Sequence, residues 1–217
     1  MGTQPDSETS EPIVMTRALE WAYAQAVNGV PGLGSAFDLV EEYDQKGVSF
    51  ESNALGLVTW QCAKAGAAGF VSGSGGLLLL PVTIPANLAT VLFIQMRMIL
   101  GIAHLAGLDI RDESVKTLVF LCLISRSPEE VFKALGVEEG ASFPMASIKQ
   151  VPGRVFLMAN KQVAYRLGVK FAERGVVNLS RFVPLLGGLV GLSVDTLYTR
   201  KVGEVATKTF GLLRTAD

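Results

Sequence analysis

The stretch AGAAGFVSGSGGLLLLPVTIPANLATVLFIQM, residues 65–96, contains no charged side chain and decides how the chain folds. It is too apolar for an ordinary surface helix, which keeps a polar side. Gly73–Gly76 and the prolines at 81 and 85 interrupt it, and a proline inside a helix costs about 3 kcal/mol. The sequence therefore predicts the end of one helix, a kinked apolar connector, and a new helix that begins near Pro85.

Helical periodicity continues on both sides of this stretch, bounded by capping residues such as Ser35 and Ser127 and by glycines at helix ends. We expect helices over residues 12–28, 36–45, 51–72, 86–106, 109 or 112 to 124, 128–136, 152–174 and 190–213. Residues 137–150 are predicted to be a loop, and the polar residues 1–11 are expected to be disordered. The predicted fold is all-α, a single helical domain of seven to nine helices over residues 12–217.

Charge is distributed unevenly along the chain. Residues 1–50 carry two basic and eight acidic side chains, whereas residues 151–217 carry ten basic and four acidic ones. The mean hydropathy is +0.39, which lies toward the values of membrane-associated proteins. A basic C-terminal third indicates attraction either to an anionic membrane surface or to the acidic end of the same domain. Nucleic acid is not an expected partner, because no aromatic stacking platform accompanies the basic residues.

The composition gives little sign of a redox or metal centre. Cys62 and Cys122 each lie in an apolar helical pattern, and we expect two buried thiols rather than a disulfide. One histidine and two separated cysteines exclude the usual zinc sites, so no metal and no cofactor are expected. The N-terminus has neither the basic nor the apolar segment of a secretory signal. We therefore expect a cytoplasmic protein, with peripheral attachment to the inner membrane as an open alternative.

The first candidate site is Arg97, the only charged residue between Lys64 and Asp109. A lone cation in apolar surroundings binds either a carboxylate within the fold or the anionic group of a lipid or fatty acid. His104 lies seven residues further on, on roughly the same helix face. An isolated histidine on an apolar helix is usually a structural residue.

Two further stretches are weaker candidates. The glycine-rich residues 71–76 precede a helix, but they match neither a P-loop nor a dinucleotide fingerprint, so a simple turn is the favoured interpretation. Asp195 lies in an otherwise uncharged stretch and needs a cationic partner, for which Arg97 and Lys161 are candidates. Arg200 follows it at five residues, which is not the ideal pairing spacing.

Several phrases together resemble the bacterial EcsC family: residues 31–35 (PGLGS), 67–73 (AAGFVSG), 80–88 (LPVTIPANL), the helix with Arg97, and 183–191 (VPLLGGLVG) followed by Asp195, Thr199 and Arg200. The resemblance spans about residues 15–212. It implies a helical domain associated with bacterial membranes or the cell envelope, whose namesake is linked to an ABC exporter and to protein secretion. It carries no agreed catalytic residues. The glycine-rich helices are also similar in texture to senescence domains, which are connected with lipid droplets and lipid transfer.

The sequence favours a non-enzymatic, peripheral membrane protein that binds phospholipid or fatty acyl chains. Asn87 and Arg97 would meet the polar end of the ligand, and basic residues such as Lys161, Arg166 and Lys170 would face anionic headgroups. The remaining candidates are the cavity residues Leu80, Ile84, Leu88 and Leu92 and the site residues His104, Asp195 and Arg200. One alternative is an interaction module for a membrane ABC transporter or secretion system. Another is a lipid hydrolase that uses Ser72 or Ser74 with Asp195 or Lys161.

Overall fold

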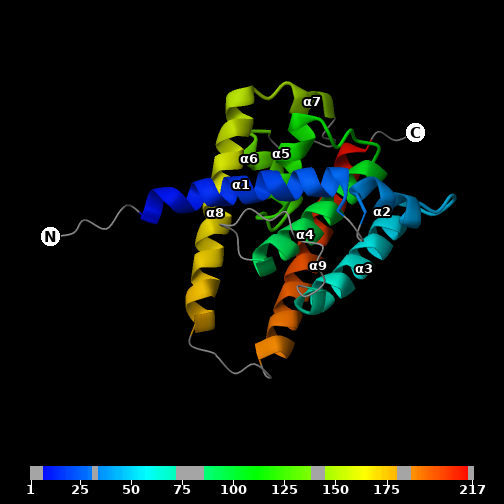
Figure 1. Cartoon of the computed structure of the whole chain (residues 1–217). Helices are drawn as coiled ribbons and strands as arrows, with labels where there is room; N and C mark the ends of the chain where they lie inside the picture. The colour runs from blue at the N-terminus through cyan, green and yellow to red at the C-terminus, as the bar shows by residue number, and fades with distance from the viewer. Residues whose placement is uncertain (1–6, 31–33, 72–85, 138–144, 180–186, 215–217) are drawn as a thin grey trace.

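The computed structural model describes residues 7–30, 34–71, 86–137, 145–179 and 187–214. Within these ranges the chain forms helices and no strand, so the fold is all-α (Figure 1). The helices are α1 (Ser7–Asn28), α2 (Ala36–Tyr43), α3 (Phe50–Val71), α4 (Ala86–Leu105), α5 (Glu113–Cys122), α6 (Pro128–Ala134), α7 (Met145–Lys149), α8 (Gly153–Leu179) and α9 (Gly187–Leu213).

Helix α4 is the centre of the domain. It contacts α1, α2, α3, α5 and α9, and every residue from Leu92 to Ala103 is buried. A helix that is apolar all round must be covered on every side, and here other helices provide the cover. Figure 1 shows α1 crossing in front of α4, with α8 to one side and α3 to the other. Because helices from both ends of the chain share this core, they form one domain.

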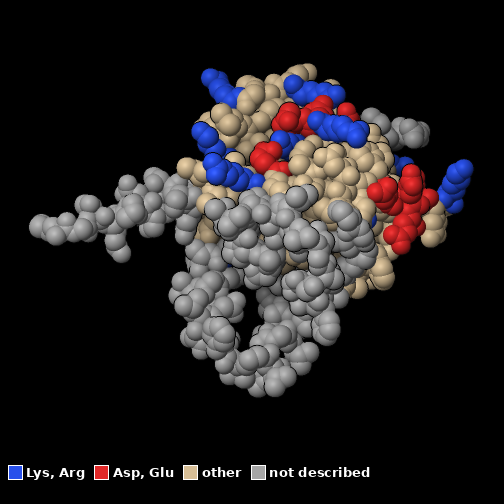
Figure 2. Space-filling view, in the orientation of Figure 1, with Lys and Arg blue, Asp and Glu red and all other residues tan. Residues whose placement is uncertain are grey.

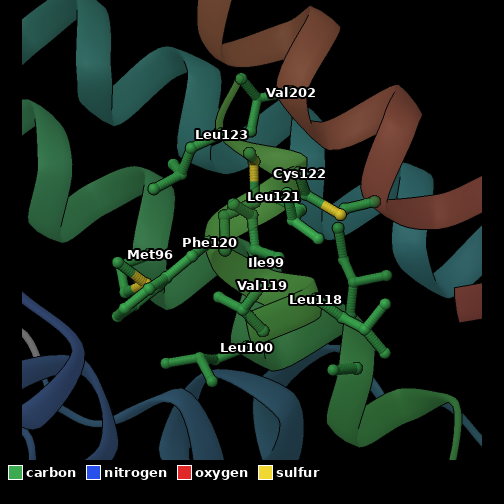
Figure 3. Close-up of a cluster of buried hydrophobic side chains, with 14 of the residues drawn as sticks. Met96, Ile99, Leu100, Leu118, Val119, Phe120, Leu121, Cys122, Leu123 and Val202 are labelled. Carbon is green, nitrogen blue, oxygen red and sulfur yellow. The ribbon is translucent and has the colours of Figure 1, made fainter. Parts of the chain in front are cut away.

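The core between α4, α5 and α9 is built from aliphatic and aromatic side chains (Figure 3). Met96, Ile99 and Leu100 of α4 are fully buried, and Phe120 of α5 and Val202 of α9 are nearly so. Two polar contacts orient α9 against this core. The Tyr198 hydroxyl donates a hydrogen bond to the carbonyl of Leu123, and the Gln95 amide donates to Thr199 Oγ1 at 3.1 Å.

Helices α3, α4 and α9 approach one another closely at two glycines. A Cβ atom on Gly203 of α9 would lie 2.7 Å from a methyl carbon of Val58 on α3. A Cβ atom on Gly101 of α4 would lie 3.1 Å from Leu57 Cδ1 on α3. The first distance is shorter than carbon atoms tolerate, so α3 and α9 hold their spacing only because residue 203 has no side chain.

Most of the predicted helix ends are confirmed. Ser35 caps α2 with a full capping box, Asp112 caps α5, and Gly29, Gly107 and Gly136 adopt positive φ angles after the helices they end. Positive φ is costly for any residue with a Cβ atom, which explains glycine at these three ends.

The largest differences from the sequence predictions concern α1, α7, α8 and α9. Helix α1 begins at Ser7, inside the tail that we expected to be disordered, and α9 begins three residues earlier than expected. Gly175 was predicted to end a helix, but α8 continues through it to Leu179, since a helical glycine costs only about 1 kcal/mol. The expected loop 137–150 contains the short helix α7.

The kinked apolar connector and the glycine run at 73–76 lie outside the described residues. In the part of the chain that is described, no helix is both long enough and apolar enough to cross a membrane.

Candidate functional site

Arg97 lies inside the domain, on the side of α4 that faces α2. Its side chain is only 4% exposed, and its Nε donates a hydrogen bond to the carbonyl oxygen of Ser35 at 3.0 Å. The capping box of α2 holds that carbonyl in place. Asp38 N donates to Ser35 Oγ at 3.1 Å, and Ser35 N donates to Asp38 Oδ2 at 2.7 Å.

Acidic groups on α2 stabilise the positive charge of the buried Arg97. Burial lowers the pKa of Arg97, and the nearby Asp38, Glu42 and Tyr43 oppose that shift. The pKa of Asp38 is lowered mainly by its hydrogen bonds from Ser35, with a smaller contribution from Arg97. An arginine side chain stays charged at neutral pH even so. These contacts support a partner within the fold, but the hydrogen-bond acceptor is the backbone carbonyl of Ser35 and not the carboxylate that the sequence predicted. A ligand at Arg97 stays a prediction.

His104 lies on the same side of α4 as Arg97, as their spacing predicts. Its ring meets the Phe37 ring of α2 edge to face, with 4.9 Å between centroids. The Arg111 guanidinium lies over the same Phe37 ring, 4.9 Å from its centroid. The Arg97 and His104 face of α4 is therefore a packing surface for the first turn of α2.

The other predicted site residues do not gather around Arg97 in the described part of the chain. Lys161 is exposed on α8, and Arg200 is exposed on α9 with its Nε 3.3 Å from Glu204 Oε1. Leu92 is buried in the core. The remaining candidates lie outside what the structure describes: the side chains of Asn87, Leu88 and Asp195, and the residues Leu80, Ile84, Ser72 and Ser74.

Both cysteines are free, buried thiols, which confirms the prediction for them. Burial raises the pKa of both, and that of Cys122 reaches about 12. Protonated thiols are poor nucleophiles and poor metal ligands. Within the described residues, no three His, Cys, Asp or Glu side chains lie close enough together to hold a metal ion.

A different surface carries exposed apolar side chains together with cations, on α8. Leu157 is 58% exposed, Met158 68% and Tyr165 60%. We define the outer face of α8 by these three residues together with Arg154, Lys161 and Val169, all of them exposed. Steps of three and four residues place them along one side of the helix. The opposite side, with Ala159, Val163 and Leu167, is buried against the domain.

No acidic residue occurs in α8 from Gly153 to Lys170, where the side chains are described. Lys170 lies 3.5 Å from the centroid of the Tyr198 ring and so contacts α9. Figure 2 shows basic and acidic side chains together over the upper part of the molecule, where α8 begins, and a group of acidic ones at the right over α2. Helix α1, from the acidic N-terminal part of the sequence, packs against α8.

Sequence reasoning identified the cations of α8 but missed the apolar residues between them. The signal was present: Ala159, Val163 and Leu167 recur every four residues, as expected for an inner face. With that side assigned to the core, Met158 and Tyr165 must point outward.

Comparison with known families gives one match. The model of the EcsC protein family matches residues 49–213, which is more than half of the chain and includes α3 to α9. Arg97 lies inside the matched segment, whereas its partner Ser35 lies before it. Comparisons with curated proteins and with solved structures give no match.

Proposed function

The chain belongs to the EcsC protein family, and we propose that it binds phospholipid reversibly at an anionic membrane surface. One observation carries the proposal: the outer face of α8 exposes large apolar side chains among cations, and no acidic residue occurs in the helix between Gly153 and Lys170. At the surface of an anionic membrane, apolar side chains that are exposed beside cations insert at the boundary between headgroups and acyl chains. The cations then face the anionic headgroups.

The magnitudes suit reversible binding. Full burial of a large apolar side chain contributes about 1.5–3 kcal/mol. Each lysine or arginine near an anionic surface contributes about 1 kcal/mol. Part of this gain offsets the loss of freedom on binding. The outer face of α8 therefore supports a peripheral contact that forms and dissociates.

This proposal places the lipid contact on α8 and not at Arg97. The Arg97 guanidinium already donates to Ser35 in the interior. It lines neither the surface hollow on α3 nor the one between α5, α6 and α8. Lys161 and Arg166, which the sequence assigned to headgroup contact, keep that role. An acyl-chain cavity formed with the connector before α4 rests on residues outside the described ranges.

Vesicle flotation tests the proposal. The protein is mixed with phosphatidylcholine vesicles that contain or lack phosphatidylglycerol, and we expect co-flotation only with the anionic ones. The double variant Met158→Gln/Tyr165→Gln should lose most of this binding. Leu55→Gln/Trp60→Gln, which removes two exposed apolar residues from α3, is the matched control. Equal binding by the two variants, or no binding by the unmodified protein, contradicts the proposal.

A second candidate function is an interaction module for a membrane transporter or secretion partner. A hollow of about 540 Å³ lies on α3 beside α2, and its lining includes Tyr43, Leu55, Thr59 and Trp60. Leu55 and Trp60 are substantially exposed, and tryptophan and tyrosine are frequent anchors of protein interfaces. Co-purification of a membrane protein that depends on Leu55 and Trp60, without vesicle binding, favours this function.

A further inference from the structure

A second hollow, of about 670 Å³, lies between the end of α5, α6 and α8. Its polar lining consists of Ser125, Arg126, Glu130, Lys133, Gln162 and Arg166. These side chains come from three separate segments: the turn after α5, the helix α6, and the middle of α8. Residues far apart in the sequence thus meet around one space.

The hollow carries excess positive charge. Arg126, Lys133 and Arg166 line it together with one carboxylate, Glu130. Glu130 Oε2 accepts the backbone N–H of Arg126 at 2.9 Å, so that carboxylate is already engaged in holding the turn. Within the described residues, no ion pair joins any of the three cations to a carboxylate.

Two carbonyl groups at the end of α5 already accept hydrogen bonds from neighbouring donors. Leu121 O accepts the N–H of Ser125 at 3.0 Å, and Leu123 O accepts the hydroxyl of Tyr198. The same bonds fix the turn that carries Arg126. Ser125 and Gln162 add neutral groups that donate hydrogen bonds, so the lining is suited to an anion with several oxygen atoms.

We propose that this hollow binds a phosphoryl group, preferentially a phosphomonoester. Three cations against one carboxylate leave a charge of about +2, and a phosphomonoester near neutral pH carries about −1.5 to −2. Two of the cations are arginines, whose planar guanidinium groups match phosphate oxygens in a bidentate manner.

The hollow opens beside the proposed membrane contact. Gln162 lies four residues after Met158 and three before Tyr165, and Arg166 lies three residues before Val169, so these pairs are neighbours on α8. A lipid with a terminal phosphate, such as phosphatidic acid, would place its headgroup in the hollow while its acyl chains contact the outer face of α8. The lipid source of the phosphoryl group rests on the proposed function, whereas the binding of a phosphoryl group does not.

The experiment has two arms, both with the full chain. In the first, inorganic phosphate is titrated in solution, with chloride at matched ionic strength as reference, and amide resonances of Ser125, Arg126 and the Gln162 side chain are followed. In the second, flotation compares vesicles containing phosphatidic acid with vesicles containing phosphatidylglycerol at matched surface charge.

The variants are Arg166→Gln and Lys133→Gln, with Lys161→Gln as control. Lys161→Gln removes the same charge from the same helix, outside the hollow. We expect the unmodified protein to prefer phosphatidic acid, and the two hollow variants to lose roughly tenfold more binding to it than to phosphatidylglycerol. Lys161→Gln should lower both equally. Thermal unfolding of each variant verifies that it is folded.

The outcomes separate the two proposals. Hollow-dependent binding of both phosphate and phosphatidic acid vesicles supports a lipid headgroup. Hollow-dependent binding of phosphate without any vesicle binding supports a soluble phosphorylated ligand, and then the membrane proposal fails while this one stands. If Arg166→Gln and Lys161→Gln behave alike in both arms, the phosphoryl site is refuted, even where the unmodified protein binds anionic vesicles.

Discussion

Helices α4 and α8 both mix apolar residues with cations, yet they use them in opposite ways. The cation of α4, Arg97, is buried and donates to Ser35. On α8, Lys161 and Arg166 are exposed beside exposed apolar residues. The more apolar helix is thus the one that other helices cover, and the less apolar one meets the surroundings.

This difference teaches that apolar content by itself does not mark a lipid contact. An apolar helix is covered by whatever the fold can place around it, and α1, α2, α3, α5 and α9 cover α4. A lipid contact instead requires apolar side chains that the fold leaves exposed. Large contiguous patches of such side chains are unusual on the surface of a monomeric protein. The following changes test whether α4 is structural and α8 is functional, beginning with the largest expected effect.

Phe93→Ala on α4 should lower the free energy of unfolding by about 3–5 kcal/mol, because it leaves a cavity in the core. Phe93 is 2% exposed. The matched change on α8, Tyr165→Ala, should alter it by less than about 0.5 kcal/mol, since the ring faces outward. Urea unfolding of both variants measures the contrast. Similar losses would mean that Tyr165 belongs to the core.

Gly203→Ala on α9 should destabilise the domain by about 3 kcal/mol, near the upper end for overpacking, because the new methyl group meets both methyl groups of Val58. Gly168→Ala on α8 is the control, because a Cβ atom added there would have no neighbouring atom within 4 Å. There the change should stabilise the domain by about 0.5–1 kcal/mol through helix propensity. Thermal melts should therefore shift in opposite directions, and a shift of the same sign would contradict the packing of α9.

Arg97→Met should cost about 1–2 kcal/mol of stability, since the bond from its charged Nε to Ser35 is lost while Ser35 O keeps its bond from Leu39 N. Binding of the folded variant to anionic vesicles should not change. Chemical denaturation and flotation on the same sample measure the two effects. A selective loss of vesicle binding at full stability would return the lipid site to Arg97.

Lys161→Gln should weaken vesicle binding by about 1 kcal/mol, roughly fivefold, and leave the unfolding free energy unchanged. The loss should shrink as salt is added, because exposed charges are screened. Lys46→Gln, an exposed cation in the loop after α2, is the control and should have no effect. Flotation over a salt series makes the measurement, and a deficit that persists at high salt would exclude an electrostatic role.

Much of the fold was predictable because local chemistry sets it. Ser35 and Asp112 cap helices with their own side chains, and Gly29, Gly107 and Gly136 end helices because their φ angles are positive. Gly175 misled the prediction, because a glycine ends a helix only where the chain turns, and packing decides where it turns. Helix α7 is too short to show a period.

Less of the candidate site was predictable. The sequence marked Arg97 as a buried cation with two alternative partners, and only the approach of α2 to α4 showed that Ser35 supplies the acceptor. The hollow with Arg126, Lys133 and Arg166 has no sequence signature, since its members come from three segments with unrelated spacing.

The sequence by itself determined the all-α class, most helix boundaries, the buried thiols and the EcsC family, because each depends on local pattern or on ordered phrases along the chain. Only the tertiary structure decided which apolar helix faces are covered by other helices and which cations lie together around one hollow. Burial and Coulomb interactions depend on distance in space, and helix packing sets those distances between residues far apart in the chain.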